Sequence, residues 1–179
     1  MSDLSDGSFL VFGGFVNGSR VNELAKFTMT NTQTISGQVL QECTADEGQP
    51  QIRASCSACV HNDKLYCFGG QDDDNGKLND LWEYDCAQNC WNQIQIAEGG
   101  LVPLCRSGHT AVTYGSKMYI FGGILELTKE LNDLLVFDFN QMCFIQGEER
   151  PDFMDGSPER RAGATQQDAF DGSSSPTRT

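Results

Sequence analysis

The chain has 179 residues, of which 39% are hydrophobic, and it carries a formal net charge of −13. This length allows one domain or a short array of repeats, and the apolar content suffices for a packed core. The negative charge argues against nucleic acid and against anionic membranes as main partners, because both would repel the protein. The acidic start "MSDLSDGS" lacks a secretory signal, and no apolar run approaches the roughly 20 residues of a membrane span, so a cytoplasmic protein is expected.

Residues 1–8 are predicted to be an N-terminal lead-in to the first of three similar segments. Each segment contains an apolar run, "FLVF", "LYCF" or "MYIF", followed at once by two glycines. The pairs are spaced by 56 and then 53 residues, and they are Gly13-Gly14, Gly69-Gly70 and Gly122-Gly123. The runs "KLYCF" and "KMYIF" predict strands buried on both faces. Glycine at their end permits a sharp exit and a close approach of neighbouring backbone.

Further features recur in the same register. A second apolar segment follows each glycine pair: "NELAKFT", then "NDLWEYD" with Trp82, then "NDLLVFD". In the last two copies Trp91 or Phe144 comes six residues after the final aspartate of that segment. The polar steps "HNDK" and "YGSK" before the second and third apolar runs suit two-residue hairpin loops. A proline-to-arginine step also recurs, as "PQIR" (50–53), "PLCR" (103–106) and "PERR" (158–161).

This period of about 50 residues, with a glycine pair and a later aromatic residue, resembles the kelch repeat. The resemblance covers roughly residues 9 to 165, and four separate features fall in one register. In that family each repeat is one blade of a β-propeller, with strands a to d running from the innermost to the outermost. The resemblance therefore implies an all-β fold, a partial kelch-type β-propeller of about three four-stranded antiparallel blades.

The repeat register also predicts where each unit begins and ends. The units are repeat 1 at 9–52 with strands b to d only, repeat 2 at 53–105, repeat 3 at 106–160, a first strand of a fourth repeat at 161–167, and a polar, disordered tail at 168–179.

Three blades do not close a ring, because propellers typically have about four to eight. The sequence leaves three explanations open. The chain is part of a longer kelch chain, or it completes its ring with a second copy, or it is an irregular open array. A homodimer would have six blades, and strand a at the end of one copy would pair with strand b at the start of the other.

The eight cysteines, which include "CSAC" at 56–59, raise the question of a zinc site. The register argues against one, because Cys59 occupies the slot that holds the apolar Val112 in the next repeat. Cys56 and Cys59 are also three apart on a predicted strand, which points them to opposite faces. We expect free thiols, no metal and no cofactor. His109 is predicted to be buried and hydrogen-bonded rather than catalytic.

Three arginines are candidates for binding a partner. The resemblance places Arg53, Arg106 and Arg161 at the start of innermost strands, near one mouth of the central channel. In some family members such arginines grip acidic peptides through charge-assisted hydrogen bonds. The alternative is a structural role, in which each arginine ties loops together through carbonyls and carboxylates.

Three aspartates form a second candidate. Asp72, Asp73 and Asp74 lie in "QDDDNGK", which the register places in the loop between strands b and c. Adjacent aspartates can bind calcium weakly, but their spacing is not that of an EF-hand loop. A solvated loop that faces a partner protein is predicted instead.

The predicted function is a non-enzymatic protein–protein interaction module, in which a rigid stack of blades presents its loops to another protein. Two alternatives stay open. The chain could be part of a kelch-type propeller enzyme, a metal-dependent oxidase or a specifier protein, with its catalytic groups outside this chain. It could also be the substrate-recognition part of a ubiquitin ligase complex. No Ser-His-Asp order or phosphate-binding loop stands out in the sequence.

Overall fold

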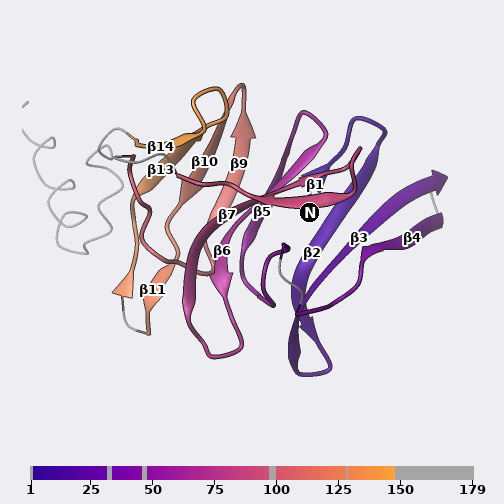
Figure 1. The fold of residues 1–179 in the computed structure, drawn as a ribbon, viewed down its shortest axis with the longest axis horizontal. Helices are drawn as coiled ribbons and strands as arrows, with labels where there is room; N and C mark the ends of the chain where they lie inside the picture. Colours follow the sequence, from indigo (N-terminus) through magenta and orange to yellow (C-terminus); the bar gives the residue numbers. More distant parts are fainter. Residues whose placement is uncertain (1, 32–33, 46–47, 97–99, 128, 148–179) are drawn as a thin grey trace, which may run out of the picture. The chain divides into compact units, whose positions relative to one another are not determined.

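A computed structural model describes residues 2–31, 34–45, 48–96, 100–127 and 129–147 (Figure 1). The regular elements in these ranges are all β-strands. No helix long and apolar enough to cross a bilayer occurs among these described residues. Residues 1–148 group into one compact unit. The predicted strand at 161–167, the predicted tail at 168–179 and Arg161 lie outside the described residues.

Three four-stranded antiparallel sheets follow one another along the described chain, and we call them blades 1, 2 and 3 (Figure 1). Blade 1 consists of β1 (Ser2–Asp3), β2 (Ser8–Val16), β3 (Ser19–Asn31) and β4 (Thr34–Gln41). Blade 2 consists of β5 (Ser57–His61), β6 (Lys64–Gln71), β7 (Lys77–Asp85) and β8 (Cys90–Gln93). Blade 3 consists of β9 (Thr110–Tyr114), β10 (Lys117–Phe121), β13 (Leu134–Asp138) and β14 (Cys143–Gln146), and a small hairpin of β11 (Ile124–Glu126) and β12 (Lys129–Glu130) extends from it. The all-β prediction and the partial propeller are confirmed.

The lead-in at 1–8 differs from the prediction, because it contributes a strand. Ser2 lies opposite Leu10 and Asp3 lies opposite Phe9, so β1 pairs with β2. Blade 1 therefore has a short strand a in addition to the expected b, c and d. This pairing uses backbone groups, which every residue carries, so the polar sequence "SD" showed no apolar pattern that would predict it.

Two-residue turns set the register of the inner strand pairs. In blade 2, Asn62 and Asp63 have φ angles of 50° and 56°, the positive values that a type I′ turn requires. His61 and Lys64 face each other across that turn, and Tyr114 and Lys117 do the same in blade 3. The hairpins predicted from "HNDK" and "YGSK" are confirmed.

The apolar core lies between the blades in two layers. Leu24 of blade 1 and Leu65 of blade 2 belong to the first layer. Phe68 of blade 2 and Met118 of blade 3 belong to the second. All four side chains are fully buried. A strand in the middle blade therefore contributes alternate residues to both layers, as expected for a sheet covered on two sides.

An aromatic residue on the outermost strand packs against the preceding blade. The ring centroid of Trp91 on β8 lies 4.8 Å from that of Phe12 in blade 1. Phe144 on β14 lies 5.5 Å from Phe68 in blade 2. Aromatic pairs at such distances contribute about 0.5–1.5 kcal/mol beyond the burial of their area. The repeated aromatic position therefore serves blade stacking.

Strand β10 is buried on one face only, which corrects the two-faced burial predicted for "KMYIF". Met118 and Ile120 are buried against blade 2. On the other face Phe121 is 41% exposed and Tyr119 is half-buried. The matching run in blade 2 is buried on both faces. The described residues provide a neighbouring blade on one side of blade 3 only, and this explains the difference.

A buried arginine joins blade 1 to blade 2. The backbone N–H of Arg53 donates to Val21 O at 3.2 Å, and its carbonyl accepts from the N–H of Gly14 at 3.0 Å, so its main chain is held by blade 1. Its guanidinium extends into blade 2, where it donates to Gly69 O at 3.0 Å and to both carboxylate oxygens of Asp80 at 2.7 Å. We call this two-blade arrangement an arginine clasp.

A second arginine clasp joins blade 2 to blade 3. The backbone of Arg106 pairs with Leu78 O and with the N–H of Gly70, each at 2.9 Å. Its guanidinium donates to Gly122 O at 3.0 Å and to the two carboxylate oxygens of Asp133 at 2.8 and 2.9 Å. Both clasp arginines are 0% exposed, so each ion pair is shielded from water on the arginine side. Bidentate pairs of this kind are strong and fix geometry.

The clasp explains why a glycine begins the first and second pairs. A Cβ atom on Gly13 would lie 2.8 Å from Arg53 O, and one on Gly69 would lie 2.8 Å from Arg106 O. Both glycines also have positive φ angles, 66° and 60°. A side chain at either position would push the next arginine out of its clasp and would strain the backbone.

We expect Arg106→Lys to lower the free energy of unfolding by about 3 kcal/mol. An ammonium group cannot reproduce the planar fork, and it would leave buried acceptors short of donors. Urea denaturation would measure the loss. Arg20→Lys is the control, because Arg20 lies outside the clasps, and it should cost less than about 1 kcal/mol. Equal costs for the two variants would contradict the role of the clasp.

Candidate functional site

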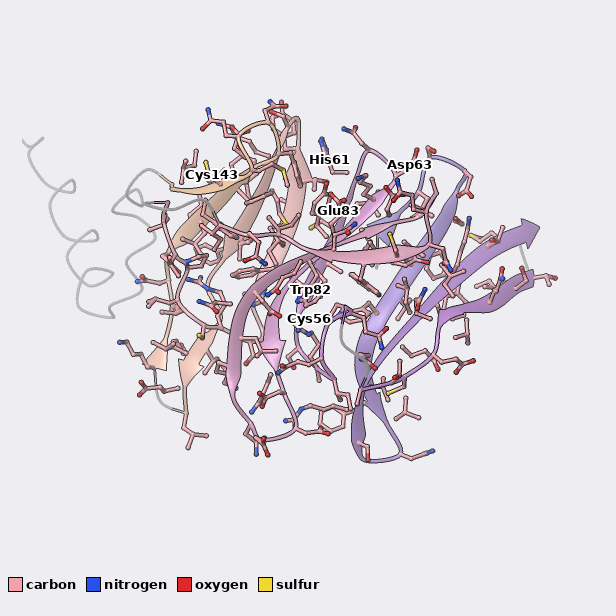
Figure 2. All side chains as sticks on the ribbon, viewed as in Figure 1. Cys56, His61, Asp63, Trp82, Glu83 and Cys143 are labelled. Atoms are coloured by element: carbon pink, nitrogen blue, oxygen red, sulfur yellow. The ribbon has the colours of Figure 1, made fainter. Side chains whose placement is uncertain are left out.

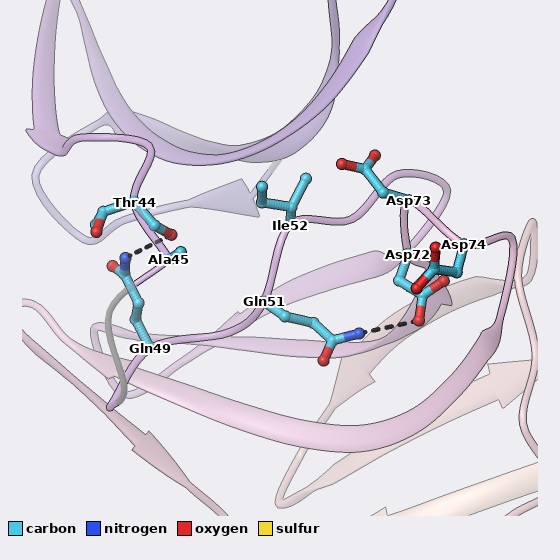
Figure 3. Close-up of a pocket in the computed structure, with 8 residues that line it drawn as sticks. All are labelled: Thr44, Ala45, Gln49, Gln51, Ile52, Asp72, Asp73 and Asp74. Atoms are coloured by element: carbon cyan, nitrogen blue, oxygen red, sulfur yellow. Dashed lines mark hydrogen bonds between the residues drawn. The ribbon is translucent and has the colours of Figure 1, made fainter.

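A groove of about 410 Å³ lies where the loops of blades 1 and 2 meet (Figure 3). One wall is the connector from β4 to β5, and the other is the loop from β6 to β7. We call it the acidic groove, and it is lined by Thr44, Ala45, Gln49, Gln51, Ile52, Asp72, Asp73 and Asp74. The three aspartates singled out from the sequence therefore lie together at a junction between blades.

Asp72 holds its own loop in shape. Its backbone N–H donates to Gly76 O at 3.0 Å, and its carboxylate accepts from the N–H of Gly76 at 2.7 Å. The side chain of Gln51, on the opposite wall, donates to the second carboxylate oxygen at 3.2 Å (Figure 3). Asn75 completes the turn with a positive φ of 64°. Asp72 is thus a structural carboxylate that also ties the two walls of the groove together.

Asp73 and Asp74 carry the exposed negative charge of the acidic groove. Both are exposed. Asp73 forms a long ion pair of 3.8 Å with Arg20, which also donates to Asn75 at 3.0 Å. Within the described part of the chain, no hydrogen bond or ion pair engages the Asp74 carboxylate. The groove can therefore attract a cationic group of a partner, and its geometry is set before that partner arrives.

A second groove of about 890 Å³ repeats this arrangement between blades 2 and 3. It is lined by Gln71, Asn75, Lys77, Cys105, Leu125, Glu126 and Leu127. It combines one cation, one anion and apolar side chains, so its character is mixed. The two grooves share one end of the blade stack, because both are bordered by the β6–β7 loop.

The opposite end of blade 2, where His61 and Asp63 lie (Figure 2), contacts both neighbouring blades. Asp63 accepts a hydrogen bond from the N–H of Ser5 in blade 1 at 3.0 Å. His61 stacks on Phe139, which follows β13, with ring centroids 4.0 Å apart. These contacts occupy the turn between β5 and β6, which leaves the grooves at the other end as the better candidates for binding.

The structure places Arg53 and Arg106 inside the clasps. Their guanidinium groups already donate to carbonyls and carboxylates of this chain, which is the arrangement expected for the structural role. That Arg53 and Arg106 bind a partner stays a prediction. The arrangement in the clasps does not favour it. The clasp acids Asp80 and Asp133 were not singled out from the sequence, although the repeated "ND" of "NDLWEYD" and "NDLLVFD" marks their positions.

His109 is buried and shares a hydrogen bond of 2.8 Å between its Nε2 and Ser57 Oγ. Its ring meets that of Phe68 edge-on, with centroids 5.3 Å apart. Burial, and secondly the positive charge of Arg106, lower its pKa to about 4. His109 is therefore neutral at pH 7 and helps to hold β9 against β5.

The cysteines are free thiols in the structure. Cys59 packs into the layer between blades 2 and 3, whereas Cys56 packs against the layer between blades 1 and 2. The predicted opposite orientation of these two cysteines is thus confirmed. No cluster of three or more potential metal ligands occurs among the described residues. Burial raises the pKa of the Cys59 thiol to about 11, which keeps it protonated.

Most of the wall opposite the aspartates was missed by sequence reasoning. Thr44 and Gln49 precede the Pro-x-x-Arg step in a stretch without a repeat motif, and Gln51 is a variable position within that step, so nothing in the sequence marked them as groove residues. Arg20 follows the turn "NGS" and was also missed. Its place next to a tight turn, at the same end of the blade as the acidic loop, is the signal that could have found it.

Comparison with known proteins agrees with this architecture. The family description "KLHDC2/KLHL20/DRC7 Kelch-repeats domain" matches residues 2–167. The chain belongs to the kelch-repeat family. Kelch repeats generally serve as protein–protein interaction modules, and members are usually non-enzymatic.

Several curated proteins are similar to this chain. Bovine (Bos taurus) kelch domain-containing protein 3 is 29% identical over 141 residues, which cover 74% of this chain and 36% of that protein. Rat (Rattus norvegicus) host cell factor 1 is 32% identical over 133 residues, or 67% of this chain and 6% of that protein. A probable serine/threonine-protein kinase of Dictyostelium discoideum is 31% identical over 118 residues, or 64% and 8%. The chain thus spans a minor part of each of these relatives.

We expect His109 to make the fold less stable as the pH falls from about 6.5 to about 4. In this window an unfolded histidine binds a proton and the buried one does not, so the total loss is about 3 kcal/mol. The unfolding free energy of the parent and of His109→Gln should be measured at both ends of the window. The parent should lose more stability than the variant. Parallel pH profiles would contradict the assignment to His109.

Proposed function

We propose that this chain is a non-enzymatic protein–protein interaction module that binds a basic segment of its partner in the acidic groove. The observation that carries the proposal is the placement of Asp73 and Asp74, both exposed, on the rim of a groove between two clasped blades. A segment with lysine or arginine side chains would pair with these carboxylates, and its apolar part would lie against Ile52.

The frame behind the groove supports this function. The clasp of Arg53 fixes the connector at Gln51 and Ile52 relative to blade 2, because those residues directly precede the clasp. The hydrogen bond between Gln51 and Asp72 joins the two walls. A groove that is already formed loses less conformational entropy on binding than a disordered loop would.

The overall charge supports the same class of partner. A net charge of −13 attracts basic proteins from a distance and speeds their encounter. Close to the surface, the charges on the rim of the groove would then orient the bound segment.

The pair Ser57 and His109 supports binding over catalysis. A serine hydroxyl that shares a hydrogen bond with a histidine nitrogen is the arrangement of an activated nucleophile. Here, however, the two residues are only 8% and 7% exposed, and their position between blades 2 and 3 leaves no access for a substrate. The hydrogen bond between Ser57 and His109 therefore has a structural role between blades 2 and 3.

The test is selection of short peptides from a random display library on the purified chain. We expect selected peptides to be rich in lysine and arginine. The double variant Asp73→Asn/Asp74→Asn should bind a selected synthetic peptide about tenfold more weakly than the parent does, because two rim charges are lost. Titration by fluorescence anisotropy at two salt concentrations would measure this, and higher salt should weaken binding to the parent further.

Asp6→Asn/Asp63→Asn is the matched control, because it removes two exposed charges at the opposite end of the blades. It should leave the peptide affinity unchanged. Selection of acidic peptides that bind the parent and the Asp73→Asn/Asp74→Asn variant with equal affinity would contradict the proposal. Such a result would support binding by the arginines instead.

A further inference from the structure

Two cysteines of blade 2 lie on one face of the sheet, next to the clasp of Arg53. Cys67 on β6 is paired with Ala58 on β5, and Cys56 comes two positions before Ala58. Side chains two positions apart on an extended chain point to the same face. Cys56 and Cys67 accordingly both belong to the layer between blades 1 and 2. Cys67 is fully buried there, whereas Cys56 is partly exposed.

The two thiols are hydrogen-bond partners, with Cys67 as the donor and Cys56 as the acceptor. The guanidinium of Arg53 acts on both thiols, and its position is fixed by Gly69 O and the carboxylate of Asp80. The hydrogen bond from Cys67, and secondly the charge of Arg53, hold the pKa of Cys56 below its usual value, against the opposing effects of burial and of Asp80. Cys56 is therefore the better nucleophile of the two.

The repeat does not require a cysteine at either position. His109 and Ile120 hold the equivalent positions in blade 3. The main chain is nevertheless alike in the two blades, because Ser55 before Cys56 has a φ of 56° and the equivalent Gly108 has a φ of 66°. A blade with this main chain thus forms with other side chains at both positions. Blade stacking alone does not account for two thiols in contact beside an arginine.

The main chain of Cys56 is less constrained than that of Cys67. Strand β5 begins at Ser57, so Cys56 lies just outside its ladder. Cys67 belongs to β6, which is paired on both sides, with β5 and with β7. A disulfide has an S–S bond of about 2.05 Å, so the two sulfur atoms must approach each other for it to form. Movement of Cys56 toward Cys67 would achieve this without disturbing the middle of the sheet.

We propose that Cys56 and Cys67 form a peroxide-sensitive thiol pair, in which Cys56 reacts with a hydroperoxide and Cys67 then converts it to an intramolecular disulfide. Such a pair consists of an accessible reactive cysteine and a resolving cysteine next to it. The partly exposed Cys56 can be reached by a molecule as small as hydrogen peroxide, and the buried Cys67 is protected from direct attack.

The reaction has two steps. The thiolate of Cys56 first attacks one oxygen of hydrogen peroxide, so that an S–O bond forms and the O–O bond breaks. The second oxygen leaves as hydroxide and takes up a proton to become water. The sulfur of Cys67 then attacks the sulfur of Cys56, the S–S bond forms, and the S–O bond breaks. The departing hydroxide leaves as water with the proton of Cys67, so two thiols and one peroxide give one disulfide and two waters.

Two other cysteines serve as internal controls. Cys59 is three positions from Cys56 but packs into the layer between blades 2 and 3, where burial raises its pKa to about 11. Cys43 is exposed. If exposure alone determined reactivity, Cys43 would react before Cys56. The proposal predicts the reverse order, because the neighbouring thiol and Arg53 activate Cys56.

The test is oxidation of the folded chain by hydrogen peroxide, followed by alkylation with N-ethylmaleimide, tryptic digestion and mass spectrometry. Trypsin cleaves after arginine and lysine and releases Cys56 in residues 54–64 and Cys67 in residues 65–77. We expect these two peptides to become joined, with Cys59 alkylated in the joined product. The joined product should form about tenfold faster than the thiol of Cys43 is lost.

Three variants assign the roles within the pair. Cys56→Ser should abolish the joined peptides. Cys67→Val keeps an apolar side chain in the layer but lacks the resolving thiol, so Cys56 should persist as a sulfenic acid that dimedone labels. Cys59→Val is the matched control, because the equivalent residue of blade 3 is Val112, and it should form the disulfide at the parent rate.

A parent chain that yields no joined peptides at a peroxide concentration that oxidises Cys43 overturns the proposal. This measurement needs no substitution, so it decides the matter even where a variant fails to fold. Joined peptides that persist in Cys56→Ser would show that Cys59 reacts instead, which also overturns the proposal. A Cys67→Val variant that is folded by circular dichroism, and in which dimedone labels Cys43 but not Cys56, overturns the role of Cys56 as the reacting cysteine.

Discussion

The structure depends on an arginine whose main chain belongs to one blade and whose side chain belongs to the next. Arg53 and Arg106 are each fully buried, and their charge is balanced by Asp80 and Asp133. A buried guanidinium without its carboxylate would be costly, so each blade can form stably only with its neighbour in place. The clasp thus couples the blades more strictly than apolar packing alone, which tolerates sliding and substitution.

The clasp also determines where binding surfaces can occur. It fixes the connector between blades at the end of the stack where the b–c loops emerge, and the two grooves lie there. At the other end, Asp63 and His61 are engaged with neighbouring blades. The chain therefore has one end devoted largely to blade contacts and one end with preformed grooves, of which the first is distinctly acidic.

Part of the candidate site could be predicted from the sequence. The aspartates at 72–74 are adjacent in the chain and follow a glycine pair, so their exposure in a loop followed from local signals. Gln51 could not be predicted, because it reaches Asp72 only when two blades are stacked. The same holds for Arg20, whose partners Asp73 and Asn75 are more than 50 positions away.

The sequence by itself determined most strands of the three described blades and the hairpins after "HNDK" and "YGSK", because these depend on side-chain alternation and turn residues within a few positions. It also marked the clasp arginines by their spacing. Only the tertiary structure decided what those arginines bind, since Arg53 and Asp80 are separated by 27 positions and meet through the fold. Tertiary structure likewise decided that "SD" at the start forms a strand and that β10 has one open face. Both outcomes depend on which backbone or blade lies alongside, and a local pattern carries no such information.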